Sequence, residues 1–179
     1  MKKLLLAAII SLSSISTAAV AEVRVGIILG FTGPIESLTP AMRDGARMAF
    51  DEASNSGNLL GGESITILEA DSTCVDSAAA TAAAEGLVAD GVTAIMGADC
   101  SGVTGAINAN VAVPNGIIMV SPSATSPGLS SVPDNGTFWR TAPSDAKGGQ
   151  VLAKLALSRG IESIAVTYTN NDYGKGLAE

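Results

Sequence analysis

The chain has 179 residues and is acidic, with 17 Asp and Glu residues against 10 Lys and Arg and a formal net charge of −7. This charge and the low aromatic content disfavour nucleic acid and anionic membranes as partners. The chain has no histidine, which removes Ser–His and Cys–His catalytic pairs and the commonest zinc ligand. We find no clustered metal-ligand motif and expect no catalytic residues, no metal and no cofactor.

Residues 1–21 are typical of a secretory signal peptide. Two lysines precede an apolar run from Leu4 to Ile10, and a stretch of small residues ends at Ala21. Serines interrupt the apolar run before it reaches the roughly 20 residues of a membrane span. The pattern predicts cleavage after Ala21 and a periplasmic protein that starts at Glu22.

Apolar strand patterns alternate with helical patterns along the rest of the chain. In chain order they are a strand at 23–29, a helix at 39–53, a strand at 64–70, a helix at 76–90, a strand at 92–97, a helix at 102–113, a strand at 116–120, a helix at 145–158 and a strand at 163–168. Near-continuous apolar strands indicate a parallel sheet that is covered on both faces. The fold class predicted is therefore α/β with a doubly wound sheet, in strand order 2-1-3-4-5.

Helix-boundary residues support these helices. Pro40 suits a first helical turn, and Asp76 is a candidate N-cap. Pro114 is expected to stop the third helix, and Gly160 to close the fourth.

The stretch from 121 to 149 contains four prolines and is predicted to be a long irregular connection. We place a domain crossing near residues 141–145. About 35 residues follow it, too few to bury a core of their own. We therefore expect a first lobe at 22–141, and the crossing with an incomplete second lobe at 142–179, within a longer two-lobed protein.

The chain has two cysteines, Cys74 and Cys100, and each follows a predicted strand. A reactive thiol, a metal ligand and a disulfide are the three alternatives for Cys100. Export to an oxidising compartment favours a disulfide between the two. Two thiols alone are too few for a structural zinc site.

Three loops rich in small polar residues follow the first, third and fourth strands, at 30–38, 97–102 and 121–127. Parallel sheets bind ligands at the carboxyl ends of their strands, near the switch point of the strand order. Ser101 would open a helix, whose N–H groups suit a carboxylate, while Ser123 and Thr125 offer acceptors for an ammonium group. This is the chemistry of an amino-acid site, although Ser and Thr at such positions are also common as caps and turns.

Seven segments, in order along the chain, resemble the substrate-binding proteins of branched-chain amino-acid ABC transporters, the leucine/isoleucine/valine-binding type. They are "VRVGIILGFTGP", "GARMAFDEAS", "ADSTCVD", "GADCSGVT", "MVSPSATSPGLS", "FWRTAPSD" and "NDYGKGLAE". The family is about twice as long as this chain, so the resemblance covers its first lobe, its first hinge crossing and the opening of its second lobe.

The resemblance implies a type I periplasmic-binding fold that closes on its ligand by a hinge and has no catalytic activity. In this reading Ser101 and Thr125 bind the ligand carboxylate, and the carbonyl of Ser123 binds the ammonium group. Tyr173 faces the ligand from the second lobe, and Cys74 pairs with Cys100.

The implied ligand is a branched-chain amino acid or a related amide, and the implied partner is a membrane permease that the protein serves as a monomer. Leucine-type members often carry an aromatic residue near Leu38, where this chain reads "SLTP". A ligand sensor of the same fold without a permease is the alternative. A hydrolase that uses Ser101 is disfavoured because the chain lacks both a histidine and a G-x-S-x-G motif.

Overall fold

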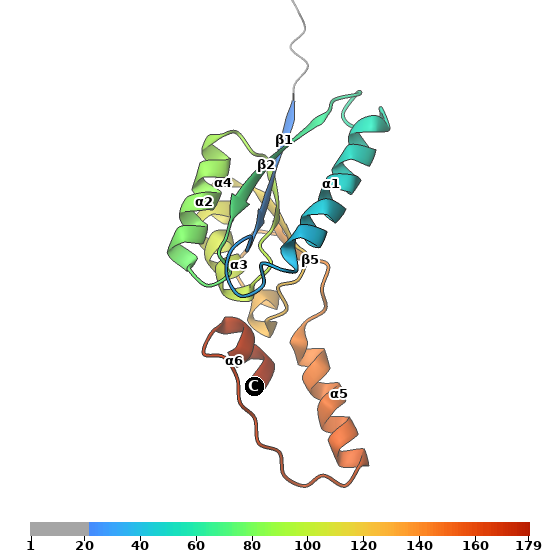
Figure 1. The fold of residues 1–179 in the computed structure, drawn as a ribbon, viewed down its shortest axis with the longest axis vertical. Coiled ribbons are helices and arrows are strands. Elements are labelled where there is room, and N and C mark those ends of the chain that lie inside the picture. Colours follow the sequence, from blue (N-terminus) through green and yellow to red (C-terminus); the bar gives the residue numbers. More distant parts are fainter. Residues whose placement is uncertain (1–21) are drawn as a thin grey trace, which may run out of the picture.

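The computed structural model describes residues 22–179 and contains one five-stranded parallel sheet in the order β2-β1-β3-β4-β5 (Figure 1). The strands are β1 (Val23–Leu29), β2 (Ile65–Asp71), β3 (Ala94–Gly97), β4 (Ile118–Ser121) and β5 (Phe138–Arg140). The α/β class and the predicted order of the first four strands are confirmed. The predicted signal peptide falls on residues 1–21, outside the described range.

Helices lie on both faces of the sheet (Figure 1). The crossover from β1 to β2 runs in the opposite direction to that from β2 to β3, so right-handed crossovers place α1 (Thr39–Asn55) and α2 (Ser77–Ala89) on opposite faces. On the α2 side, α3 (Ser101–Ile107) adds Val103 and Ile107 to a core that includes Ile28, Ile95 and Met119. This core holds α3 against the sheet, and the loops that follow the strands meet at the carboxyl ends of those strands.

The predicted boundary of α2 is confirmed by its cap. The side chain of Asp76 accepts hydrogen bonds from the backbone N–H groups of Ala78 at 2.9 Å and Ala79 at 3.0 Å. These are two of the donors that a helix start leaves without partners. Pro40 lies in the first turn of α1, as expected.

Pro114 does not stop the third helix, contrary to the prediction. The helix continues from α3 through a π-helical turn at Asn108–Ala112 into α4 (Val113–Asn115), and it ends at Gly116, whose φ is +65°. A proline conflicts with the carbonyl four residues earlier in an ordinary α-turn. The wider π turn relieves that conflict, and the left-handed glycine then closes the helix.

The fifth strand is also not where the sequence predicted it. Residues 163–168 form no strand and are exposed, whereas Phe138–Arg140, inside the supposedly irregular connection, forms β5 beside β4. The apolar run at 163–168 has the composition of a strand. Among the described residues, however, no strand lies next to it to form hydrogen bonds with its backbone N–H and C=O groups.

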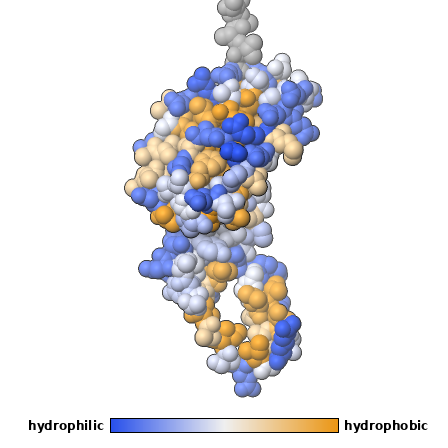
Figure 2. All heavy atoms as spheres, viewed as in Figure 1, coloured by the Kyte–Doolittle hydropathy of each residue, from blue (hydrophilic) through white to orange (hydrophobic). Residues whose placement is uncertain are grey.

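The segment after β5 projects away from the sheet (Figure 1). Helix α5 (Asp145–Ser158) leads away from it, and an extended stretch returns to α6 (Asp172–Ala178), which packs near α3. Figure 2 shows apolar side chains along this projecting part, and Leu152, Leu157 and Val166 are exposed. No helix between residues 22 and 179 is long and apolar enough to cross a membrane.

Candidate ligand-binding site

A cavity of about 640 Å³ lies at the carboxyl ends of the strands. The loops after β1, β2, β3 and β4 all contribute to its lining, together with α6. All four residues predicted to bind the ligand line it: Ser101, Ser123, Thr125 and Tyr173. The structure therefore brings the predicted residues together, and their roles toward a ligand stay a prediction.

Ser101 opens α3 and is only 2% exposed. Its Oγ accepts a hydrogen bond from the backbone N–H of Ser126 at 3.1 Å. Because that bond uses a lone pair of the oxygen, the hydroxyl proton can still be donated to a ligand. Ser101 is thus a buried donor held in a fixed position.

Ser123 and Thr125 come from the loop after β4. The hydroxyl of Ser123 donates to the carbonyl of Asp99 at 2.9 Å, so this side chain ties two strand-end loops together. The carbonyl of Thr125 accepts from the N–H of Asp145 at 3.0 Å, which fixes the loop to the start of α5. Within residues 22–179 the Thr125 hydroxyl has no hydrogen-bond partner, and it is available to a ligand.

Tyr173 lies on α6 and is 45% exposed. The helix start is fixed by Asn171, whose side chain accepts from the N–H of Gly174 at 2.8 Å. Asn171 and Asp172 line the cavity beside Tyr173. The α6 start therefore forms the side of the cavity that faces the strand-end loops.

The sequence reasoning missed Asp99, which joins three loops. It is 3% exposed, and its carboxylate accepts from the N–H of Gly30 at 2.7 Å, the hydroxyl of Ser72 at 3.3 Å and the N–H of Cys100 at 3.0 Å. A disulfide joins Cys74 to Cys100, as predicted, with an S–S distance of 2.00 Å. Asp99 and the disulfide thus hold Cys100, the residue before Ser101, close to the loops after β1 and β2.

A second acidic residue missed by the sequence reasoning, Asp71, ends β2. It accepts hydrogen bonds from Thr32 and Thr73. Burial raises the pKa of the Asp71 carboxyl, but the hydrogen bonds from the Thr32 side chain and from the backbone of Thr73, Thr32 and Phe31 outweigh burial and hold that pKa below its ordinary value. The only sequence signal for Asp71 and Asp99 is their place at strand ends.

The lining of the cavity divides into a charged part and an apolar wall. The ionisable carboxyl side chains in it are Asp99, Asp145 and Asp172, and no Lys or Arg lines it. One carboxylate oxygen of Asp145 is buried without a hydrogen-bond partner among residues 22–179. We define the apolar wall as Pro34, Ile35, Leu38, Met42 and Val75.

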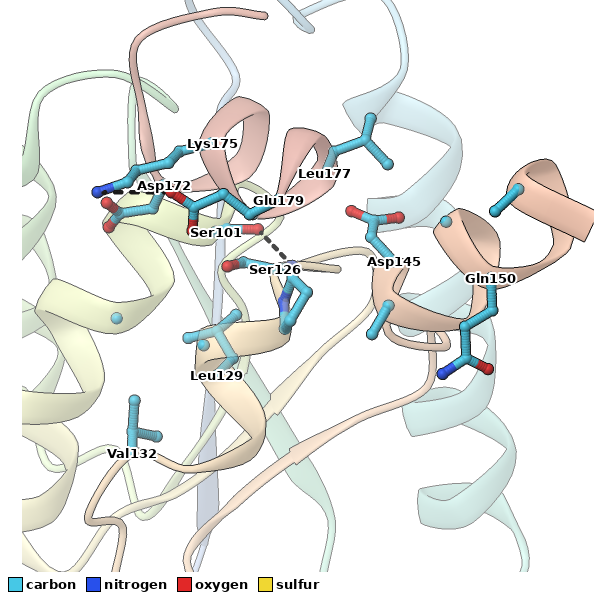
Figure 3. Close-up of a pocket in the computed structure, with 17 residues that line it drawn as sticks. Ser101, Ser126, Leu129, Val132, Asp145, Gln150, Asp172, Lys175, Leu177 and Glu179 are labelled. Atoms are coloured by element: carbon cyan, nitrogen blue, oxygen red, sulfur yellow. Dashed lines mark hydrogen bonds and ion pairs between the residues drawn. The ribbon is translucent and has the colours of Figure 1, made fainter. Parts of the chain in front are cut away.

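A second cavity, of about 790 Å³, adjoins the first (Figure 3). Ser101, Asp145 and Asp172 line both cavities. Figure 3 shows the second cavity between α5, α6 and the turn that carries Ser126 and Leu129. Among the predicted residues it contains Ser101 alone, so we place the candidate site in the first cavity.

No three His, Cys, Asp or Glu side chains in the described part of the chain are grouped so that they could hold a metal ion.

Replacing Gly33 by Ala is expected to destabilise the loop after β1. Gly33 has a φ of +99°, and a Cβ there would collide with the carbonyl oxygen of Thr73. We expect a loss of about 1–3 kcal/mol in the free energy of unfolding, measured in urea. Gly45→Ala, on an exposed turn of α1 with open space around it, is the matched control and should stabilise by about 0.5–1 kcal/mol. Equal effects of the two changes would contradict this description of the loop.

Comparison with known proteins places the fold in a family. The profile of the family described as periplasmic binding protein matches residues 22–179. The chain belongs to the periplasmic binding protein family.

Its relatives include binding proteins named for amino acids. The chain is 30% identical to the Leu/Ile/Val-binding protein BraC3 of Rhizobium johnstonii over 99% of this chain and 47% of that protein. It is also 30% identical to the leucine-specific-binding protein of Salmonella typhimurium, over 98% of this chain and 47% of that protein. The chain therefore spans about half the length of the curated relatives it matches.

A solved structure with a similar fold is the branched-chain amino acid transporter substrate binding protein LivJ of Streptococcus pneumoniae, in complex with isoleucine. The TM-score is 0.73 at 27% identity, and the match covers 88% of this chain and 44% of that one.

Proposed function

We propose that this chain forms the first lobe, at 22–141, and the beginning of the second lobe of an exported solute-binding protein. It captures an amino acid, branched-chain or a related amide, between the two lobes and delivers it to an ABC transporter permease, acting as a monomer. The observation that carries the proposal is the convergence of Ser101, Ser123, Thr125 and Tyr173 on one cavity at the carboxyl edge of the sheet.

The chemistry of the cavity supports an amino acid. The buried hydroxyl of Ser101 and the hydroxyl of Thr125 are donors for a carboxylate. The carbonyl of Ser123 and the unpartnered carboxylate oxygen of Asp145 are acceptors for an ammonium group. The apolar wall faces the remaining part of such a ligand.

The same residues support binding without chemical conversion. This chain has no histidine, so it supplies no imidazole base of its own that could activate Ser101 as a nucleophile. Among the relatives, the names describe binding proteins. We therefore assign no catalytic step to this chain.

Isothermal titration of the full-length protein against a panel of amino acids and their amides tests the proposal. We expect heat of binding for at least one member with an apolar side chain. The absence of heat for every member of the panel would contradict the proposed ligand class. Uptake of the bound compound should fall when the gene is deleted, and intact uptake would favour a sensor over a transport protein.

A further inference from the structure

The apolar wall depends on a loop with few internal hydrogen bonds. Residues 30–38 connect β1 to α1 and contribute Pro34, Ile35 and Leu38 to the wall. The backbone bonds within the loop are short-range, such as that from the N–H of Leu38 to the carbonyl of Ile35 at 2.8 Å. Leu38 is 56% exposed, so packing holds this part of the wall weakly.

Among the described residues, Asp71 accepts the long-range hydrogen bonds of this loop apart from the bond that Gly30 donates to Asp99. In the described chain, every hydrogen bond that ties residues 31–38 to a sequence-distant element ends on the carboxylate of Asp71. The hydroxyl of Thr32 donates to Oδ2 at 2.6 Å, and the N–H of Thr32 donates to Oδ1 at 3.3 Å. A charged acceptor makes such bonds stronger than neutral ones.

The same carboxylate holds the opposite side of the wall. Oδ1 of Asp71 also accepts from the N–H of Thr73 at 2.8 Å. Thr73 and Cys74 both have left-handed backbone angles, with φ of +56° and +68°, and Val75 follows them into the wall. One side chain therefore bonds to both loops that carry Pro34, Ile35, Leu38 and Val75, in addition to the links made by Asp99 and the disulfide, and it does so from outside the cavity.

Resting on the proposed function, we propose that Asp71 is a positioning residue that sets which ligand side chain the cavity accepts. Its hydrogen bonds to Thr32 and Thr73 fix the distance between Ile35 and Leu38 on one loop and Val75 on the other. The groups that bind the ligand's carboxylate and ammonium come from the loops after β3 and β4 and, for Asp145, from the start of α5. Among the described residues Asp71 forms no hydrogen bond with any of these groups. Asp71 thus acts on the side-chain end of the ligand alone.

The test compares the affinities of L-leucine and L-alanine for the full-length protein and its Asp71→Asn variant by isothermal titration. The two probes share the carboxylate and ammonium groups and differ in apolar side chain. An amide in place of the carboxylate turns one acceptor oxygen into a donor, which leaves a donor of Thr32 or Thr73 without its partner. We expect the affinity for L-leucine to fall about tenfold and that for L-alanine less than about threefold.

Two controls separate positioning from a general loss of stability. Asp134→Asn removes the charge of another aspartate that accepts a backbone N–H, from Gly136 at 2.9 Å, but it lies outside the cavity and should leave both affinities unchanged. Thr32→Val should reproduce the change in selectivity, and Thr32→Ser, which retains the hydroxyl, should restore it. Because the Thr32 side chain is exposed, we expect these two variants to fold, and they test the proposal even if Asp71→Asn does not fold.

Hydrogen exchange of the ligand-free protein gives a second readout. Amides of residues 31–38 should exchange faster in Asp71→Asn than in Asp134→Asn. Equal loss of affinity for both probes, or no loss for either, overturns the positioning role and leaves the proposed function standing. A wild-type protein that binds neither probe nor any other amino acid overturns the proposed function, and the selectivity role with it.

Discussion

Removing the disulfide between Cys74 and Cys100 is expected to lower the free energy of unfolding by about 3–4 kcal/mol. The joined residues are 26 apart in the sequence. In the chain-entropy model, a cross-link over a loop of this length reduces the conformational freedom of the unfolded chain by that amount. Urea unfolding of the full-length Cys74→Ser/Cys100→Ser protein measures it.

The wild-type protein treated with a reductant is the control for this double variant. Both lack the cross-link, so their unfolding midpoints should agree. If oxidised and reduced wild-type protein unfold at the same urea concentration, the disulfide contributes nothing and this prediction is wrong.

Loss of the disulfide should affect ligand affinity less than stability. Cys100 is also held through its N–H, which donates to Asp99, and Ser101 is held by Ser126. These bonds persist when the cross-link is cut, so the hydroxyl of Ser101 keeps its position in the folded protein.

Replacing Ser101 and Thr125 by Ala is expected to weaken amino-acid binding strongly. Each change removes a hydroxyl that, in our proposal, donates to the ligand carboxylate within a largely buried site. The usual cost of leaving a buried polar group without its partner is about 1–3 kcal/mol, which is roughly 5-fold to 150-fold in affinity for each change. Titration of the two single variants and of the double variant measures these losses.

The matched control removes one serine and one threonine hydroxyl elsewhere. Ser131 and Thr81 each donate to a nearby backbone carbonyl, and neither lines a cavity described above. The Ser131→Ala/Thr81→Ala protein should bind as the wild type does. Unchanged affinity in both Ser101→Ala and Thr125→Ala would show that the site has been assigned wrongly.

Local patterns predicted most of the fold. The strand at 23–29 and the helix at 145–158 have the predicted bounds, because continuous apolar runs and 3.6-residue periodicity are properties of the segments themselves. The pairing of strands, in contrast, depends on which other segment lies beside each one. Phe138–Arg140 is a strand only because β4 lies beside it, and residues 163–168 are not, since no described strand lies beside them.

The candidate site, like the fold, was predictable only in part. Ser101, Ser123 and Thr125 follow parallel strands, so they had to meet at one edge. Asp71 and Asp99 were not predictable, because their contacts depend on strand register. The pairing of Leu29 with Asp71 brings the end of β2 beside Thr32, and the pairing of Ile28 with Gly97 brings Asp99 beside Gly30.

The central claim is that the cavity at the carboxyl edge binds an amino acid through the loops after β3 and β4. A crystal structure of the full-length protein, grown with the amino acid that titrates most tightly, tests it directly. We predict the ligand carboxylate within hydrogen-bonding distance of the hydroxyls of Ser101 and Thr125, with the ligand side chain against Ile35 and Leu38. A ligand bound instead in the adjoining cavity, beside Gln150 and Lys175, would contradict the account.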